Sequence, residues 1–476
     1  KVKKKFILFL CLESFELFFF IIWSVVTIKM GKHDYGIKVI SSKKNLLINK
    51  LSIMFNYELI ILEDVKKNKK IDAKLLKRIN MLNSSNDFYK FKYHGFDLGC
   101  MIISNFCRIH RVGFVNFNSY LQKKIIKNTL INFIEEYDSL FNQEFLKNIH
   151  KIYTFEKNLF PYLHFFLFSL KKKIDLIHWS GSNLDEKTFI VKRYSKKNIY
   201  SHHSSISSKL WNKIKNNYSN NIAVRNKIIF KKRFSGNFAP FSVNLIECGK
   251  NFNLKIKKIN KKKNCIIFSH ILHDTLYFFG KEYYDSYAHW LISTVKIACK
   301  NTNVNWHIKI HPSNIYRGEF KKGFSKEEDI IRQELKYIPP HIKFIYPDTK
   351  INPLAWMKFA DIGVTIRGTA GLEMAVLGKK VITCGKNRYE NKGFTIDPKS
   401  KGDYEKILLN LPNIKKTSKR SFQKANLFYN YVFEKKGFRC NFININMKNK
   451  IFNWNSINFK LVENKILKNI NLDNFK

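Results

Sequence analysis

The chain carries its clearest structural signal in the segment Ile362-Gly-Val-Thr-Ile-Arg-Gly-Thr-Ala-Gly-Leu-Glu-Met-Ala-Val-Leu-Gly-Lys-Lys-Val-Ile-Thr-Cys-Gly385. Its first residues are largely apolar, which predicts a buried strand over residues 362–365. Small residues then form a turn that opens a helix, and this helix ends at Gly378. A second apolar strand follows over residues 381–384. The segment therefore predicts a strand–helix–strand unit of a parallel sheet.

The same alternation extends from this segment toward the N-terminus. We predict strands at residues 265–269, 306–310 and 343–345, and helices at 284–299 and 353–360. Short apolar strands that alternate with helices are typical of a doubly wound sheet with right-handed crossovers. This half of the chain is therefore expected to form a Rossmann-like domain.

The first half of the chain shows a less regular copy of this pattern. The predicted elements are strands at residues 6–12, 36–41, 58–63 and 174–179, helices at 15–30 and 46–55, and a mostly helical, lysine-rich stretch from 72 to 168. We therefore expect an α/β fold with two Rossmann-like, doubly wound domains that face a cleft.

The domain boundaries follow from where the periodicity stops. Residues 1–225 are expected to form an N-terminal Rossmann-like domain with a helical insertion, and residues 264–415 a C-terminal Rossmann-like domain. Residues 226–263 lack periodicity and end in a lysine run, so we interpret them as a linker. Residues 416–476 are predicted to be a C-terminal helical tail.

The chain of 476 residues is strongly basic. It contains 86 Lys and Arg but only 36 Asp and Glu, which gives a net charge of +50. One interpretation is an anionic partner, whether nucleic acid, a membrane surface or an acidic substrate. The interpretation we favour is a compositional bias toward Lys, Asn, Ile and Phe, because the lysines are scattered and not grouped on one face. No nucleic-acid-binding motif is recognisable, so nucleic acid is not expected as a partner.

The N-terminal sequence is similar to that of a membrane anchor, because lysines precede an apolar stretch that extends to Ile28. Glu13 and Glu16 interrupt this stretch, and a carboxylate at mid-bilayer costs about 2.5–3.5 kcal/mol. We therefore expect a soluble, cytoplasmic protein. The eight cysteines form no Cys-x-x-Cys pair and have no metal-like spacing with histidine, which favours a reducing compartment and no structural metal.

Two motifs of the second half are suited to binding a phosphate group. His311 lies in Ile308-Lys-Ile-His-Pro312 at the end of a strand, where an imidazole can stabilise a leaving nucleotide. The turn Arg367-Gly-Thr-Ala-Gly371 opens a helix whose N–H groups and dipole favour a phosphate, and Glu373 can accept hydrogen bonds from a ribose. Each motif also fits an ordinary strand end. Because both follow strands of one sheet, they are predicted to converge on one crevice.

The segment from Cys265 to about Leu408 resembles the bacterial capsule polysaccharide biosynthesis glycosyltransferases. The pieces that match are Phe268-Ser-His-Ile-Leu-His-Asp274, Ile308-Lys-Ile-His-Pro312, Arg367-Gly-Thr-Ala-Gly-Leu-Glu373, and Gly385 with Tyr389. The resemblance implies a GT-B fold, with the donor nucleotide in the C-terminal half and the acceptor in the N-terminal half.

The His-Pro pair is also similar to that of bacterial sialyltransferases and Kdo transferases, which use CMP-activated acidic sugars. This resemblance implies that His311 contacts the phosphate of CMP and that Thr369 holds the same group. It favours a CMP-sugar such as CMP-Kdo, with a UDP-sugar as the alternative because the Arg367-Gly-Thr turn departs from the pattern. The expected nucleotide-binding residues are Lys309, His311, Pro312, Arg367, Gly368, Thr369, Gly371, Glu373, Gly385 and Tyr389.

An inverting transfer needs a general base that takes a proton from the acceptor hydroxyl. Glu13 follows the first strand and Asp274 follows the first strand of the second half, although a helix cap and a turn residue are their alternative roles. We therefore predict Glu13, Asp274 and His311 as catalytic residues. The residues predicted on the acceptor side are Arg108, Arg111, Ser180, Lys192, Arg193 and His203.

The resemblance implies a glycosyltransferase whose cleft uses helix and side-chain charge in place of a metal ion, and the absence of a plausible D-x-D motif agrees with this. It is expected to move a sugar from a nucleotide-activated donor to a growing capsular or other surface polysaccharide. No cofactor is expected, since the nucleotide-sugar is a co-substrate. The expected partners are a glycan or glycolipid acceptor and, by peripheral contact, the anionic inner membrane. The alternative is a non-catalytic capsule polysaccharide assembly or export factor with a GT-B-like fold.

Overall fold

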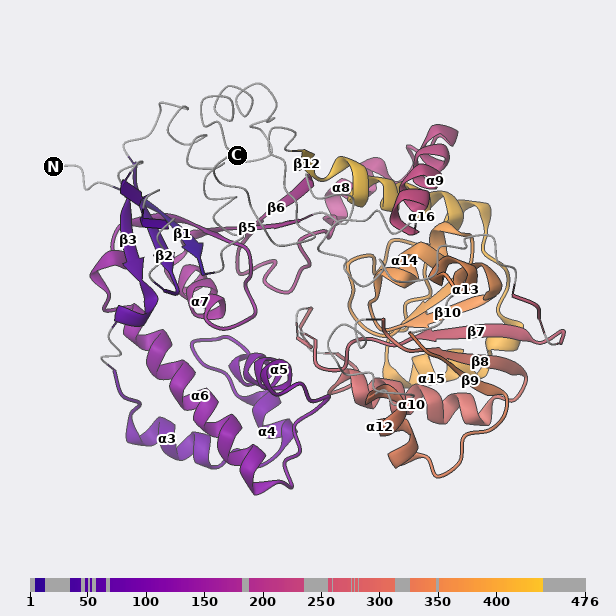
Figure 1. The fold of residues 1–476 in the computed structure, drawn as a ribbon, viewed down its shortest axis with the longest axis horizontal. Coiled ribbons are helices and arrows are strands. Elements are labelled where there is room, and N and C mark those ends of the chain that lie inside the picture. Colours follow the sequence, from indigo (N-terminus) through magenta and orange to yellow (C-terminus); the bar gives the residue numbers. More distant parts are fainter. Residues whose placement is uncertain are drawn as a thin grey trace. The chain divides into compact units, whose positions relative to one another are not determined.

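The chain folds into two α/β units, each built around a largely parallel sheet (Figure 1). The first unit comprises Lys1–Phe106, Val115–Ile199 and Gly437–Lys476, and the second comprises Cys107–Phe114 and Tyr200–Lys436. The structure is a computed structural model, and it describes residues 5–12, 35–43, 48–49, 52–53, 57–65, 69–181, 188–234, 256–258, 260–274, 276–277, 279–280, 282–312, 326–347 and 351–439.

The first unit contains a seven-stranded sheet in the order β12-β6-β5-β4-β1-β2-β3. The strands are β1 (Lys5–Cys11), β2 (Tyr35–Ser41), β3 (Glu58–Ile61), β4 (Ile149–Thr154), β5 (Asp175–Gly181), β6 (Thr188–Tyr194) and β12 (Phe438–Arg439). The five strands from β5 to β3 are parallel, whereas β6 and β12 pair antiparallel at one edge. β1, the middle one of the five parallel strands, is buried from Ile7 to its end at Cys11, so it lies in the core of this unit.

The helices of the first unit are α3 (Ala73–Asn80), α4 (Ser85–Lys90), α5 (Leu98–His110), α6 (Tyr120–Leu140) and α7 (Tyr162–Lys172), although the last four residues of α5 belong to the second unit. The short helix α3 packs on the long helix α6, α6 packs on α7, and α7 packs on β5 (Figure 1). The helix α7 connects β4 to β5, which are adjacent and parallel, so it forms the crossover expected of a βαβ unit.

The second unit contains a five-stranded, fully parallel sheet in the order β11-β10-β7-β8-β9. The strands are β7 (Lys263–Phe268), β8 (Val304–Lys309), β9 (Ile342–Ile345), β10 (Ile362–Thr365) and β11 (Lys380–Thr383). The helices are α8 (Ser208–Ile214), α9 (Asn220–Phe234), α10 (Tyr287–Lys300), α12 (Lys326–Glu334), α13 (Pro353–Phe359), α14 (Thr369–Val376), α15 (Lys401–Leu409) and α16 (Lys419–Asn430). Figure 1 shows α10, α12 and α15 together near one end of the unit, and α14 beside α16.

The predicted α/β class with two Rossmann-like sheets is confirmed. The strand at 362–365 begins and ends at the predicted residues, and the other strands of the second sheet lie within two residues of their predicted bounds. The helix predicted from residue 284 begins at Tyr287, because Ser286 caps it and accepts a hydrogen bond from the His289 N–H at 3.0 Å. The helix predicted at 15–30 lies outside the described residues, as does most of the one at 46–55.

Two strands of the first sheet differ from the prediction. The region 72–168 was expected to be mostly helical, yet it contains β4, which lies between β1 and β5. No strand was predicted after β5, yet residues 188–194 form β6, which pairs antiparallel with β5. In β4 the alternation of buried and exposed side chains is weak, and its stability comes from its two neighbours, for example through stacking of Tyr153 on Phe9 at 4.9 Å.

The units divide the chain at different positions from those predicted. The second unit includes Tyr200–Lys436, whereas the C-terminal domain was expected over residues 264–415, and α9 extends from the expected N-terminal domain into the expected linker. The reason is packing, since α9 lies on α16 and Asn226 donates to the backbone oxygen of Asn426 at 2.8 Å. The chain also returns to the first unit after Lys436, where β12 pairs with β6.

Among the helices of the described residues, none combines the length and the hydropathy needed to span a bilayer. Six cysteines fall within the described residues, and all six are free thiols. Five of them are buried and Cys299 is half-buried, as expected of cysteines that pack as small apolar side chains.

Candidate functional site

One edge of the second sheet brings together the motifs predicted to bind phosphate. From β7 the chain proceeds to β8 and β9 on one side, and it later forms β10 and β11 on the other side. The strand order therefore reverses between β7 and β10, and ligands of open α/β sheets bind outside the carboxyl ends of strands at such a reversal. His311 follows β8, and Arg367 and Thr369 follow β10, so both motifs lie at this edge.

The backbone of His311 is tied to the end of the neighbouring strand. Its N–H donates to Oε1 of Glu327 at 3.3 Å, and the hydroxyl of Ser269, directly after β7, donates to the same oxygen at 3.1 Å. Glu327 is 1% exposed and therefore joins the ends of β7 and β8 from inside the fold. The half-buried ring of His311 lies 6.4 Å from the ring of His270, whose pKa is lowered by burial. His270 is thus neutral at neutral pH and adds no positive charge beside His311.

The turn before α14 is held by two hydrogen bonds that fix the start of the helix. The N–H of Gly368 donates to Oγ1 of Thr365 at 3.2 Å, and the hydroxyl of Tyr389 donates to the carbonyl of Gly368 at 2.8 Å. Tyr389 is fully buried, so it supports the turn from behind. Gly368 and Thr369 are half-buried, and the first N–H groups of a helix have no partner within the helix itself. The turn can therefore present backbone donors to an anion.

Gly371 is required here for packing, because a Cβ at this position would lie 2.4 Å from the Tyr389 hydroxyl and 2.8 Å from Cγ2 of Thr365. We expect Gly371→Ala to lower the free energy of unfolding by about 1–3 kcal/mol, as overpacking does. Gly402→Ala in α15 is the matched control, because its Cβ would meet no atom within 4 Å and should stabilise the helix by up to about 1 kcal/mol. Urea denaturation measures both. Equal stability of the two variants would contradict the packing role.

Arg388, which follows β11, is a buried cation whose partners are hydroxyl groups. Its Nη2 donates to Oγ1 of Thr369 at 2.8 Å and its Nη1 donates to Oγ of Ser204 at 3.2 Å. Arg388 is 6% exposed and Ser204 is 1% exposed. Among the described residues, no carboxylate forms an ion pair with Arg388, and burial lowers its pKa from the ordinary value. Such a charge lacks the counter-ion that buried charges in proteins require.

Arg367, by contrast, is paired within the fold. Its Nη2 lies 2.7 Å from Oε1 of Glu282, and both side chains are only 4% exposed. The guanidinium also lies over the rings of Phe279 and Tyr287, at 4.9 and 5.2 Å from their centroids. Its Nε is buried and has no hydrogen-bond partner among the described residues. Arg367, which was predicted to bind a phosphate, is therefore paired with Glu282. Its Nε–H is the donor that has no hydrogen-bond partner among the described residues.

The other predicted nucleotide-binding residues also have structural roles. Glu373 is 3% exposed and is paired with Nε of Arg233 from α9, so the carboxylate assigned to a ribose is engaged by a guanidinium. Gly385 has a φ of +99°, and a Cβ there would lie 2.0 Å from Oε2 of Glu282. The remaining two residues flank His311 in the chain, and they are the buried Lys309 and the half-buried Pro312.

Three of the predicted catalytic and acceptor residues interact within the second unit. Oδ1 of Asp274 lies 2.8 Å from Nη1 of Arg108, so the predicted base is paired with a residue predicted to hold the acceptor. The ring of His203 lies beside that of His202, with centroids 3.8 Å apart and ring planes tilted by 37°. Arg111 is exposed, and its backbone oxygen accepts a hydrogen bond from Nζ of Lys326 at 2.6 Å.

The other predicted acceptor residues lie in the first unit, on β5 and β6. The hydroxyl of Ser180 donates to the carbonyl of Gly181 at 3.2 Å. Burial lowers the pKa of Lys192 to about 8, and Nη2 of Arg193 lies 2.6 Å from Oδ1 of Asp175. The predicted acceptor residues therefore belong to both units. Glu13, the other predicted base, lies outside the described residues.

Three site residues were not predicted from the sequence: Arg388, Glu327 and Glu282. Only Arg388 left a local signal, because a basic residue five positions beyond the end of a strand, here β11, is suited to an anion site. Within the part of the chain that the structure describes, no group of three or more His, Cys, Asp or Glu side chains is arranged to hold a metal ion.

Comparison with known proteins gives likenesses among solved structures alone. No protein-family model matches the chain, and no curated protein matches it. KpsC of Thermosulfurimonas dismutans, a beta Kdo 2,7 transferase, is 14% identical over 71% of this chain and 89% of that chain, with a TM-score of 0.38. A glycosyltransferase from Rickettsia africae is 12% identical over 100% and 99% of the two chains, with a TM-score of 0.29. Anabaena HepE in complex with UDP-glucose is 10% identical over 97% and 98%, with a TM-score of 0.29. Likenesses this distant indicate nothing about function, which has to be derived from the site residues.

Proposed function

We propose that the protein is a glycosyltransferase that moves a sugar from a nucleotide-activated donor to a capsular or other surface polysaccharide. The observation that carries this proposal is Arg388, a buried guanidinium with hydroxyl partners at the first residue of α14. A phosphate bound at this turn supplies the missing counter-ion and accepts hydrogen bonds from the helix N-terminus. A CMP-sugar such as CMP-Kdo is the favoured donor, and a UDP-sugar is the alternative.

The chemistry that these residues support is a displacement at the anomeric carbon. An acceptor hydroxyl oxygen forms the new bond as the bond between the anomeric carbon and the phosphate oxygen breaks, and the phosphate takes up negative charge. Arg388, Thr369 and His311 stabilise that charge, which needs no metal ion. The hydroxyl proton passes to a general base, for which Glu13 and Asp274 are the proposed groups. Direct displacement by the acceptor inverts the anomeric configuration.

The proposal includes a location and a membrane partner. Donors of this kind are made inside the cell, so we place the enzyme in the cytoplasm. Its net charge of +50 supports peripheral contact with the anionic inner membrane, because each basic residue near such a surface contributes about 1 kcal/mol. The acceptor is then a glycan or a glycolipid at that surface.

Thermal unfolding in the presence of CMP, UDP, GDP and ADP tests the donor site. We expect one nucleotide to stabilise the wild type, by about 2.7 kcal/mol at a hundredfold excess over its dissociation constant. His311→Ala removes a donor to the phosphate and should weaken the same nucleotide about 10- to 100-fold. His341→Ala is the matched control, because His341 precedes β9 at the opposite end of the sheet, where its Nε2 lies 3.0 Å from the carbonyl of Ala298.

The outcome decides between the two functions considered. Stabilisation that is lost in His311→Ala and kept in His341→Ala supports the transferase and identifies the donor nucleotide. If no nucleotide stabilises the wild type at millimolar concentration, the transferase proposal is wrong, and a non-catalytic assembly or export factor replaces it.

A further inference from the structure

The hydroxyl group of Ser204 lies between a histidine ring and the guanidinium of Arg388. Its Oγ is 2.7 Å from Nδ1 of His202, and it accepts a hydrogen bond from Nη1 of Arg388 at 3.2 Å. Ser204 is 1% exposed, and His202 is half-buried. All three residues belong to the second unit, so the buried arginine of the donor site is connected within that unit to the segment that precedes α8.

The direction of these hydrogen bonds follows from the backbone. The N–H of Ser204 donates to Nδ1 of His202 at 3.1 Å, and an imidazole nitrogen that accepts a hydrogen bond carries no proton. The Ser204 hydroxyl faces the same nitrogen, so it donates its proton to Nδ1. Its oxygen is thereby left as an acceptor, which is what Arg388 requires, because a guanidinium has five N–H donors and no acceptor. His202 therefore turns the Ser204 hydroxyl toward Arg388 with its oxygen.

The same contact makes a turn of the backbone between His202 and Ser205. A side chain that accepts from the N–H two residues later forms the kind of turn that Asn and Asp commonly make. The N–H of Ser205 donates to the carbonyl of His202 at 3.0 Å and closes this turn. The ring of His202 also stacks on that of Phe279, with centroids 5.7 Å apart and ring planes at 6°. The imidazole is therefore held in one orientation by the turn and by the stacked ring.

Arg388 is held on its other side by Thr369, the first residue of α14. Its Nη2 donates to Oγ1 of Thr369 at 2.8 Å. The Thr369 hydroxyl accepts this hydrogen bond, so its own proton can be donated to a phosphate at the start of the helix. The two bonds use two of the five N–H groups of Arg388, and the others can bind the same phosphate. Ser204 therefore holds the guanidinium from inside the fold, whereas Thr369 belongs to the binding surface.

We propose that His202 and Ser204 are positioning residues of the donor site, which hold Arg388 in the orientation that binds the phosphate. Both act through Arg388, and neither is proposed to contact the nucleotide. Their effect on affinity arises because an arginine that is not held in place loses rotamer freedom when the ligand binds, and this loss weakens binding. The inference rests on the proposed transferase function and deepens it, since it extends the donor site to a segment of the chain in which no nucleotide-binding motif was recognised.

Calorimetric titration of the full-length protein with CMP, UDP, GDP and ADP tests the inference. Ser204→Ala and His202→Leu each remove one positioning group, and each should weaken the nucleotide that binds the wild type about tenfold, as the loss of a hydrogen bond to a charged group does. His202→Asn keeps an acceptor oxygen where Nδ1 lies, and it should keep the affinity within about threefold of the wild type. Ser205→Ala is the matched control, because the Ser205 hydroxyl has no hydrogen-bond partner among the described residues, and it should leave the affinity unchanged.

The two His202 variants distinguish positioning from packing. Leucine keeps an apolar side chain against Phe279 and lacks the acceptor, whereas asparagine keeps the acceptor and lacks the ring. A residue that only fills space would therefore tolerate leucine better than asparagine. The positioning role predicts the opposite order of nucleotide affinities.

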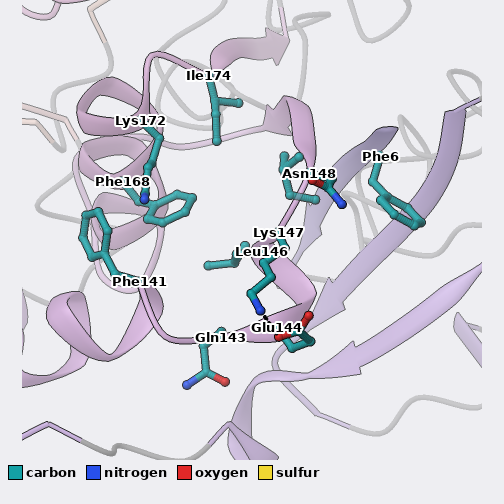
Figure 2. A pocket seen from close by; sticks show the side chains of 11 residues that line it. Phe6, Phe141, Gln143, Glu144, Leu146, Lys147, Asn148, Phe168, Lys172 and Ile174 are labelled. Atoms are coloured by element: carbon teal, nitrogen blue, oxygen red, sulfur yellow. Dashed lines mark ion pairs between the residues drawn. The ribbon is translucent and has the colours of Figure 1, made fainter. Parts of the chain in front are cut away.

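A cavity of about 720 Å³ in the first unit is an alternative place for a nucleotide (Figure 2). Its volume lies in the range of about 300–1,000 Å³ typical of small-molecule pockets, and Lys147 and Lys172 lie on its wall. It lies beside the amino ends of β1, β4 and β5, however, and ligands of such sheets bind at the carboxyl ends. Lys147 pairs with Glu144 at 2.5 Å, and Lys172 lies 5.1 Å from the centroid of the Phe141 ring. We therefore expect Lys147→Gln to leave the nucleotide affinity unchanged.

The outcomes separate this inference from the proposed function. If Arg388→Gln weakens the nucleotide while Ser204→Ala and His202→Leu do not, the positioning role is overturned and the donor site stands. An affinity of His202→Asn that is no higher than that of His202→Leu also overturns it. If Lys147→Gln weakens binding and Ser204→Ala does not, the nucleotide binds in the first unit and both proposals are wrong. If no nucleotide binds the wild type, the proposed function fails, and this inference fails with it.

Discussion

Replacing Arg388 with glutamine should abolish most nucleotide binding without lowering the stability of the unliganded protein. Truncating one partner of a buried, hydrogen-bonded charge pair costs about 2–5 kcal/mol, which corresponds to roughly 30-fold to several thousand-fold in affinity. The unliganded protein, however, holds this guanidinium at 6% exposure with hydroxyl partners and no paired carboxylate among the described residues. Removing an uncompensated buried charge is neutral or stabilising. Calorimetric titration and urea denaturation measure the two effects.

Arg420→Gln is the control for Arg388→Gln. Arg420 is exposed on α16 in the same unit, so its loss should change both affinity and stability by little. The opposite signs expected for Arg388 are typical of a binding site that is kept at a cost to stability. A large loss of stability in Arg388→Gln, together with unchanged nucleotide affinity, would show that Arg388 is structural, and the donor site would have to lie elsewhere.

The second sheet could be predicted in detail because each of its strands is a short apolar run that a helix signal follows. β10 is the clearest case, since all four of its residues are buried and a glycine-rich turn comes next. β4 could not be predicted in this way, because its second and third residues, His150 and Lys151, are polar and partly exposed. It is a strand because β1 and β5 provide hydrogen-bonding partners on both sides, and this tertiary context is not present in the local sequence.

The sequence could predict which candidate site residues lie at strand ends, but not the partners that these residues have in the fold. His311 and Thr369 could be predicted because a strand end is a local feature of the sequence. Arg388 could not, because its partner Ser204 is 184 residues away in the chain, and a hydrogen bond over that distance leaves no periodic pattern. The same reason explains why Arg367 was predicted to bind the nucleotide and its pairing with a carboxylate was not. Its partner Glu282 lies 85 residues earlier, in a segment with no recognisable motif.

Breaking the Arg367–Glu282 pair should have the largest effect on stability. We expect Glu282→Gln to lower the free energy of unfolding by about 3–5 kcal/mol, because it leaves a guanidinium of 4% exposure without its carboxylate. Glu282 also accepts a hydrogen bond from the Lys386 N–H at 2.9 Å, so its loss loosens the turn that leads to Arg388. The double variant Arg367→Met/Glu282→Leu should lose much less than Glu282→Gln, since an apolar pair of similar size replaces a buried ion pair at little cost. Urea denaturation of the variants gives these values.

The control is the exposed pair Lys296–Glu334, whose charged atoms are 3.2 Å apart and whose side chains are 48% and 53% exposed. Glu334→Gln should change stability by less than about 1 kcal/mol, because exposed ion pairs contribute little. The two interpretations of Arg367 then separate. Suppose that Glu282→Gln lowers the free energy of unfolding as little as Glu334→Gln does, and that Arg367→Met weakens nucleotide binding. Arg367 then binds the phosphate, and its pairing with Glu282 is not needed for stability. If Glu282→Gln has the large effect and the double variant restores stability, Arg367 belongs to the scaffold, and Arg388 is the arginine left to hold the phosphate.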